Sequence, residues 1–139
     1  TLTCDLRTDE NKLSFWKVEN DNDLDDAFIA LASNMNSLGT IVAVKIKDDD
    51  FDKLSFNEEL GETPTFNINQ KHCNIINLTY GTFEIVITAI LKAIRENYVI
   101  RKTKGEMKSL LIKAYEDKKL NTQKISERIL LDIGVPLNK

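Results

Sequence analysis

From Leu13 to Ile46 the chain reads LSFWKVENDNDLDDAFIALASNMNSLGTIVAVKI, and this stretch decides the fold. Leu13–Val18 is apolar on both faces of an extended chain, which is typical of a central strand. Asn22–Met35 carries apolar residues at helical spacing, and Ile41–Ile46 is a short apolar run rich in β-branched residues. Strand, helix and strand in this order predict a right-handed crossover that places Ile41–Ile46 parallel to Leu13–Val18.

The residues before Leu13 predict a partner for the first strand. Leu2, Cys4 and Leu6 alternate with polar residues, which is the period of a half-buried strand. A polar run at residues 8–12 then supplies the turn. Residues 1–18 are therefore expected to form a β-hairpin, and the crossover strand would extend it to a three-stranded sheet.

The chain after Ile46 is predicted to be a loop followed by helices. Lys47–Phe66 contains Gly61, Pro64 and seven acids, and reads as a loop with one short helical turn. Helical character is expected from Asn67 onward, and Phe83–Asn97 is apolar nearly all round, as in a core helix. A capping box at residues 103–106 opens a further helix, and residues 122–133 form the last one.

Together these segments predict an α+β fold. The expected architecture is a small N-terminal three-stranded sheet, made of hairpin, crossover helix and third strand, followed by a C-terminal group of three to four helices. The chain has 139 residues, the length of one domain. We therefore expect a single domain, 1–139, with a sheet-rich acidic half at 1–66 and a helical basic half at 67–139.

The charge is divided unequally along the chain. Residues 1–70 carry a net charge of −9 and residues 71–139 a net charge of +6, which the overall value of −3 conceals. Such asymmetry bears on partners and association rates more than on the fold. Four acids at residues 21–26 have a structural explanation, because negative charge is stabilised at the start of a helix.

The composition also indicates where the protein works. The first ten residues are polar and acidic, unlike a secretory signal, and two cysteines are too few for a disulfide framework. The longest apolar run, Ile85–Leu91, is far shorter than the about 20 residues that a membrane span needs. We therefore expect a cytoplasmic protein that has no membrane partner.

The sequence lacks the residues that most catalytic mechanisms require. The five glycines are isolated, so no phosphate-binding loop of the known glycine-rich types can form. His72 is the single histidine, and it reads as a half-buried helix residue rather than as a member of a catalytic or metal-binding set. The sequence predicts no catalytic residue, no metal site and no cofactor, hence a protein that is not an enzyme.

The strongest functional signal is the loop Asp48–Pro64, named the acidic loop below. Its net charge is −6, and apolar residues lie between the acids. Charge steers an encounter with a basic partner and apolar groups anchor it, so this mixture favours a docking surface. The candidate partner-binding residues are Asp48, Asp49, Asp50, Asp52, Glu58, Glu59, Glu62, Phe51 and Phe56. In the structural alternative, Phe51, Leu54 and Phe56 tie the loop to the core.

Two other sites are weighed against this one. A basic stripe with an aromatic residue can follow a phosphate backbone, although the same pattern describes a solvated helix face. Its candidate nucleic-acid-binding residues are Arg101, Lys102, Lys104, Lys108, Tyr115 and Lys119. The carboxylates at residues 48–52 follow a predicted strand directly, where Mg²⁺-dependent nucleases hold metal, but they also suit a solvated loop.

The leading prediction is a non-enzymatic protein-interaction module. It would be a small bacterial inhibitor or immunity-type protein that blocks a basic toxin, or an accessory subunit of a larger complex. The alternatives are a nucleic-acid-associated module that uses the helix at 101–119, and a Mg²⁺-dependent hydrolase or nuclease with carboxylates near 48–52. If the acidic loop and the basic stripe lie at opposite ends, they form two separate surfaces.

Overall fold

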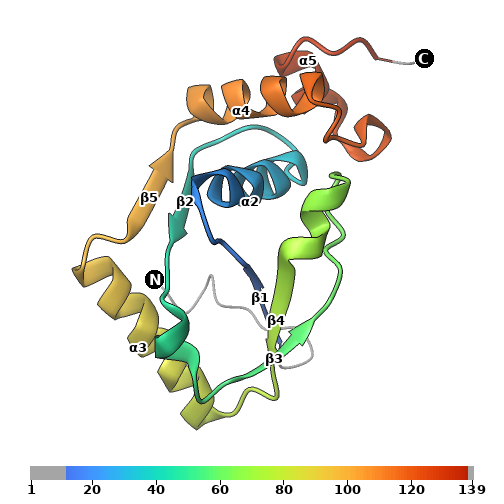
Figure 1. Cartoon of the computed structure of the whole chain (residues 1–139). Coiled ribbons are helices and arrows are strands. Elements are labelled where there is room, and N and C mark those ends of the chain that lie inside the picture. The colour runs from blue at the N-terminus through green and yellow to red at the C-terminus, as the bar shows by residue number, and fades with distance from the viewer. Residues whose placement is uncertain (1–11, 138–139) are drawn as a thin grey trace.

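The computed structural model describes residues 12–137 and has an α+β fold, as predicted (Figure 1). These described residues form a three-stranded antiparallel sheet, a separate two-stranded sheet and four α-helices. In chain order the elements are β1 Leu13–Trp16, α2 Asp21–Ser33, β2 Ile41–Val44, η1 Asp48–Phe51, β3 Ser55–Glu58, η2 Asn67–Lys71, β4 His72–Ile76, α3 Tyr80–Arg95, β5 Val99–Lys102, α4 Lys104–Glu116, η3 Thr122–Lys124 and α5 Glu127–Asp132, where η denotes a 3-10 helix.

The three-stranded sheet has the order β1–β4–β3, and both pairings are antiparallel. Leu13 lies opposite Ile75, and Phe56 lies opposite Ile75 on the other side. This arrangement contradicts two predictions: residues 72–76 are a strand rather than a helix, and the third strand of the sheet is not Ile41–Ile46. The predicted strand at residues 2–6 lies outside the described residues.

The predicted parallel crossover is wrong because β2 belongs to another sheet. It pairs antiparallel with β5, so that Ile41 lies opposite Lys102 and Val44 opposite Val99. The right-handed crossover rule applies only to parallel strands of one sheet, and β2 and β1 do not share one. The half at 67–139 therefore contains two strands, β4 and β5, besides its helices.

The helices begin at the caps that their sequences offer. The side chain of Asn20 accepts from the backbone N–H of Asp23 at the start of α2, and Thr103 does the same for Glu106 in α4. Thr79 and Thr82 form a capping box at the start of α3. Residues 122–133 are not one helix, because Ser126 caps a new one, α5, after a short 3-10 turn.

Two groups of buried residues form the core. One joins α2, α4 and α5, where Phe28, Met107, Leu111 and Ile129 are almost completely buried. The other lies between the three-stranded sheet, η1 and α3. Its buried members are Leu13, Phe51, Leu54, Ile75, Val86, Ala89 and Ile90. Two of them, Phe51 and Leu54, come from the acidic loop, so the start of this loop belongs to the core and not only to the surface.

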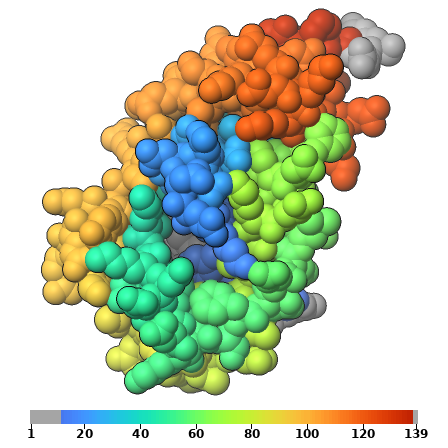
Figure 2. Space-filling view, viewed as in Figure 1, coloured from blue at the N-terminus to red at the C-terminus, as the bar shows by residue number. Residues whose placement is uncertain are grey.

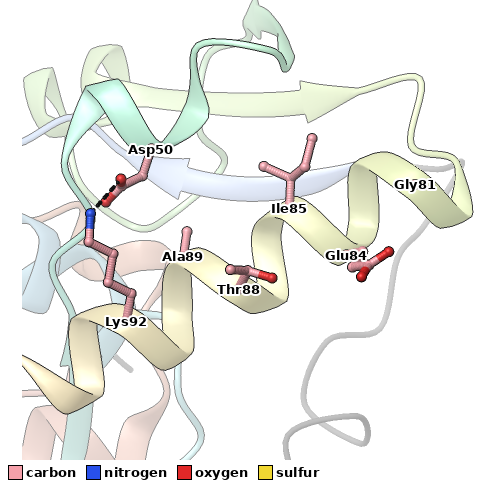
Figure 3. A pocket seen from close by; sticks show the side chains of 7 residues that line it. All are labelled: Asp50, Gly81, Glu84, Ile85, Thr88, Ala89 and Lys92. Atoms are coloured by element: carbon pink, nitrogen blue, oxygen red, sulfur yellow. Dashed lines mark hydrogen bonds and ion pairs between the residues drawn. The ribbon is translucent and has the colours of Figure 1, made fainter.

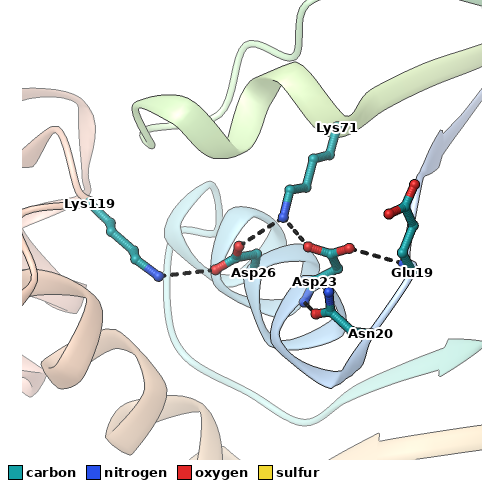
Figure 4. A network of polar contacts seen from close by, with 6 residues as sticks. All are labelled: Glu19, Asn20, Asp23, Asp26, Lys71 and Lys119. Atoms are coloured by element: carbon teal, nitrogen blue, oxygen red, sulfur yellow. Dashed lines mark hydrogen bonds and ion pairs between the residues drawn. The ribbon is translucent and has the colours of Figure 1, made fainter.

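Ion pairs at the start of α2 connect this helix to η2 and to the segment that follows α4. Nζ of Lys71, at the end of η2, donates to the carboxylates of Asp23 and Asp26, and lies 3.2 Å from Oδ2 of Asp26 (Figure 4). Nζ of Lys119, just beyond α4, lies 3.4 Å from Oδ1 of Asp26. The acids at this helix start thus stabilise contacts between distant segments as well as the helix itself.

These contacts shift the ionisation of both partners. The hydrogen bond from Lys71, helped by the backbone N–H of Glu19, holds the pKa of Asp23 below its ordinary value. The same hydrogen bond raises the pKa of Lys71. A carboxyl group whose pKa is lowered by folding contributes stability at pH values above its unfolded pKa of about 3.9, and this contribution disappears as the pH falls through the lower, folded value.

We expect Asp23→Asn to reduce the acid dependence of stability. The free energy of unfolding, measured by urea denaturation at pH 7 and at pH 3, should fall less for this variant than for the wild type, because the carboxylate that must be protonated is gone. Asp21→Asn is the control, since Asp21 is exposed in the same helical turn and forms no ion pair within residues 12–137. An equal fall in wild type and Asp23→Asn would contradict this account of the helix start.

Candidate functional site

The first part of the acidic loop is held against the core. Phe51 and Leu54 are buried, and the ring of Phe51 makes an edge contact with Phe15 at a centroid distance of 5.5 Å. The ring centroid of Phe56 lies 6.1 Å from that of Phe51, but Phe56 remains 47% exposed. The alternative in which apolar residues tie the loop down is therefore correct for Phe51 and Leu54, and only Phe56 keeps an exposed ring.

Three acids of the loop have internal ion pairs. Asp50 lies 2.9 Å from Nζ of Lys92 on α3, and its hydrogen bond raises the pKa of Lys92. Glu58 pairs with Lys17, which lowers the pKa of Glu58. These carboxylates are partly neutralised, so they contribute less to an outward-facing negative surface.

Glu59 is the third paired acid. Its carboxylate lies 3.7 Å from Nζ of Lys12 and accepts from the side chain of Asn74 at 2.6 Å. Its backbone carbonyl accepts from Nδ1 of His72 at 2.7 Å. Glu59 thus joins β4 to the residues that follow β3, and its role in the fold is structural.

The other four acids of the loop face solvent. Asp48, Asp49, Asp52 and Glu62 are exposed and form no ion pair within the described part of the chain. Asp48, Asp49 and Asp52 come shortly before β3, which lies at one edge of its sheet and whose four residues are all exposed. Within residues 12–137, β3 makes no backbone hydrogen bond to any segment except β4. Within residues 12–137, the loop therefore presents a strand edge without a partner, preceded by acids without ion pairs.

The end of the acidic loop is fixed by Asn69. The buried side chain of Asn69 donates to the carbonyls of Thr63 and Thr65 at 3.0 and 2.9 Å and accepts from Thr63. The backbone N–H of Gly61 donates to the carbonyl of Asn69 at 2.9 Å. A Cβ at Gly61 would lie 2.8 Å from Oδ1 of Asn69 and 3.1 Å from the ring of Trp16. Only glycine allows the loop to pack this closely.

The acidic loop and the basic stripe lie at opposite ends of the molecule over most of their length (Figure 2). In the described residues, backbone hydrogen bonds connect the two regions where the loop ends: the N–H of Phe66 donates to the carbonyl of Lys119, and that of Asn121 to the carbonyl of Pro64. The two charged regions are therefore separate surfaces.

The basic stripe is not continuous. Lys119 is paired with Asp26, and Nζ of Lys102 lies 3.9 Å from Glu106. Arg101, Lys104 and Lys108 are exposed without an ion pair in residues 12–137, and Tyr115 is 41% exposed. Three free cations thus remain of the six residues predicted for nucleic-acid binding.

An open hollow of about 280 Å³ lies between η1 and α3 (Figure 3). Asp50 and Lys92 form one side of it as an ion pair, and Glu84 and Thr88 line it from α3. A catalytic hollow needs a nucleophile beside a base or several converging ionisable groups. Asp50 and Lys92 are paired with each other, and Glu84 lies at the other end of the hollow, away from them (Figure 3), so these groups do not converge and we assign no chemistry to the hollow.

No other set of side chains among the described residues resembles a catalytic centre. His72 and Cys73 point to opposite faces of β4, and burial raises the pKa of the Cys73 thiol. In the part of the chain from 12 to 137, no three His, Cys, Asp or Glu side chains gather as metal ligands would. The carboxylates at 48–52 that sequence reasoning offered to Mg²⁺ are therefore not joined by further ligands there. Within that same range, no helix has the length and apolar character needed to cross a membrane.

We expect Gly61→Ala to destabilise the fold by about 1–3 kcal/mol, the usual cost of overpacking. The added methyl group would displace Asn69 or Trp16 and disturb the end of the acidic loop. Gly105→Ala is the matched control, because a Cβ there meets no atom within 4 Å and lies in α4, where alanine should stabilise by up to about 1 kcal/mol. Urea denaturation of both variants checks this, and equal stability of the two would contradict the packing described.

Comparisons with protein-family models, with curated proteins and with solved structures give no match to this chain. Function must therefore be inferred from the geometry of the chain itself.

Proposed function

We propose that this chain is a non-enzymatic protein-interaction module that docks on a basic protein through β3 and the acids before it. The observation that carries the proposal is the outer edge of β3, which no segment of the described chain covers and where Phe56 is half exposed within the acidic loop. Backbone groups at such an edge can pair with an extended segment of another chain, which adds to the sheet as a new strand.

The negative charge around β3 determines which kind of segment would pair with its outer edge. Asp48, Asp49 and Asp52 precede the strand without internal partners in residues 12–137, and Glu58 lies on it. A second copy of the same edge would be repelled, whereas a segment rich in Lys or Arg would be attracted and its association accelerated. Phe56 supplies an apolar contact that the charges surround, as in the anchor of a small interface.

The same surface serves both versions of the proposal. As an inhibitor or immunity-type protein, the chain would cover a basic toxin, such as a nuclease, whose own substrate is anionic. As an accessory subunit, it would bind a basic segment of a larger assembly. Both versions place the protein in the bacterial cytoplasm, and the free, buried thiol of Cys73 is compatible with a reducing compartment.

A charge reversal at the loop tests the proposal. The double variant Asp49→Lys with Asp52→Lys changes two exposed acids that have no ion pair within residues 12–137. Tagged wild-type and variant chains are used to purify partners from the native host, and the recovered proteins are quantified by mass spectrometry. We expect a basic protein to be recovered with the wild type, in amounts that fall as salt is raised, and to be lost with the variant.

The control carries the same change of charge at the other end of the molecule. Glu116→Lys with Asp117→Lys alters the exposed end of α4 and should leave recovery of the basic protein unchanged. If the loop variant recovers the same partner as the wild type, or if both double variants lose it equally, docking through the acidic loop is wrong.

A further inference from the structure

One face of α3 is apolar but exposed, although the sequence predicted a core helix. The inward face packs Val86, Ala89, Ile90 and Ala93. On the outer face, Tyr80 is 98% exposed, Leu91 42% and Ile94 41%. Together with the partly exposed Ile87, these side chains are named the outer stripe. Their spacing of seven, four and three residues places them along one side of the helix.

The helix lies at the periphery of the molecule (Figure 1), and the outer stripe is exposed with no strand or helix of residues 12–137 packed over Tyr80, Leu91 or Ile94. The helix has 16 residues, and at about 1.5 Å per residue it is about 24 Å long. An apolar stripe that runs along most of such a length on an outer helix is typical of a helix–helix interface.

Two opposite charges border the outer stripe on the same flank. Glu84 and Arg95 are eleven residues apart, which at about 100° per residue leaves them only about 20° apart around the helix axis. Both are exposed, and neither forms an ion pair within residues 12–137. Along the axis they are separated by about 16 Å, so they cannot pair within one helix.

We propose that the outer stripe is a homodimer interface in which α3 pairs antiparallel with α3 of a second copy. In an antiparallel helix pair like flanks face each other and the helix directions are reversed. Glu84 of one copy then lies beside Arg95 of the other, twice by symmetry. In the same register Ile87 of one copy meets Leu91 of the other near the two-fold axis. A parallel pair would bring opposite flanks together and leave both charges without partners.

In this arrangement the stripe and the two charges beside it are complementary to those of a second copy. An interface of this kind uses the same patch on both copies and closes at two subunits. It also leaves the edge of β3 outside the contact, because α3 lies against η1 and β2 and makes no pairing with β3. The proposal is independent of the docking function, and either can fail without the other.

Sedimentation velocity across a range of protein concentrations tests the interface. We expect the wild type to be a dimer, and Leu91→Glu to weaken dimerisation about 100-fold or more, because a carboxylate would be desolvated in the seam. Leu131→Glu is the matched control: Leu131 is 64% exposed on α5, away from the stripe, and its variant should dimerise as the wild type does. Circular dichroism confirms that each variant is folded.

A charge exchange distinguishes the antiparallel pair from unspecific association. Glu84→Arg and Arg95→Glu should each weaken the dimer several-fold, because each places like charges together, and the double variant should restore it. A wild type that stays monomeric up to about 1 mM, the weak end of specific affinities, would overturn the proposal. So would a dimer that survives Leu91→Glu, or a double variant that is weaker than both single ones.

Discussion

The central position of β4 between β1 and β3 is the constraint on which the rest of the structure depends. Ile75 is fully buried between Leu13 and Phe56, its cross-strand neighbours, and so ties together three segments that are distant in sequence. Because β4 occupies the inner edge of β3, the outer edge of β3 remains without a partner in the described residues. The display of Phe56 and the neighbouring acids is therefore a consequence of sheet order.

Much of the unequal charge distribution is used inside the molecule. Asp23 and Asp26 bind Lys71 and Lys119, and Asp50 binds Lys92, so acids of the first half meet lysines of the second. The acids of these ion pairs are largely covered and the lysines are partly exposed, and the pairs fix the places where distant elements meet. Of the two charged regions predicted as sites, the part that is exposed and unpaired within residues 12–137 is smaller than the totals suggest: a few acids near β3 and a few cations on β5 and α4.

The helices could be predicted because their signals are local. The capping residue of α4 and the apolar spacing of α2 lie within single segments, and both helices form close to the expected bounds. Strand pairing depends on partners that local sequence does not reveal. In β4, the polar residue Asn74 occupies a position that an alternating pattern assigns to solvent. It is nevertheless buried, because Glu59 and Ser14 satisfy its amide. The four-residue β5 carries two charges and has no distinct pattern.

The same limit applies to the candidate site. Its acidic character was evident from composition, but the division between paired and free acids was not, since Lys17 and Lys92 come from elements far away in sequence. Burial of Phe51 likewise depends on Phe15 across the fold. The prediction of α3 as a core helix is wrong for its outer side for a related reason: periodicity shows that a helix is apolar nearly all round, but not whether both of its sides are covered.

Hydrogen exchange at the four amides of β3 tests the central claim most directly. In an edge strand, alternate N–H groups bond to the neighbouring strand and the others face solvent. Amide exchange measured by NMR on the free chain should therefore show slow and fast exchange alternating along Ser55–Glu58, with the outward amides exchanging as rapidly as those of open loops. Uniformly slow exchange along the strand would show that its outer edge is already covered, and would contradict the docking surface proposed here.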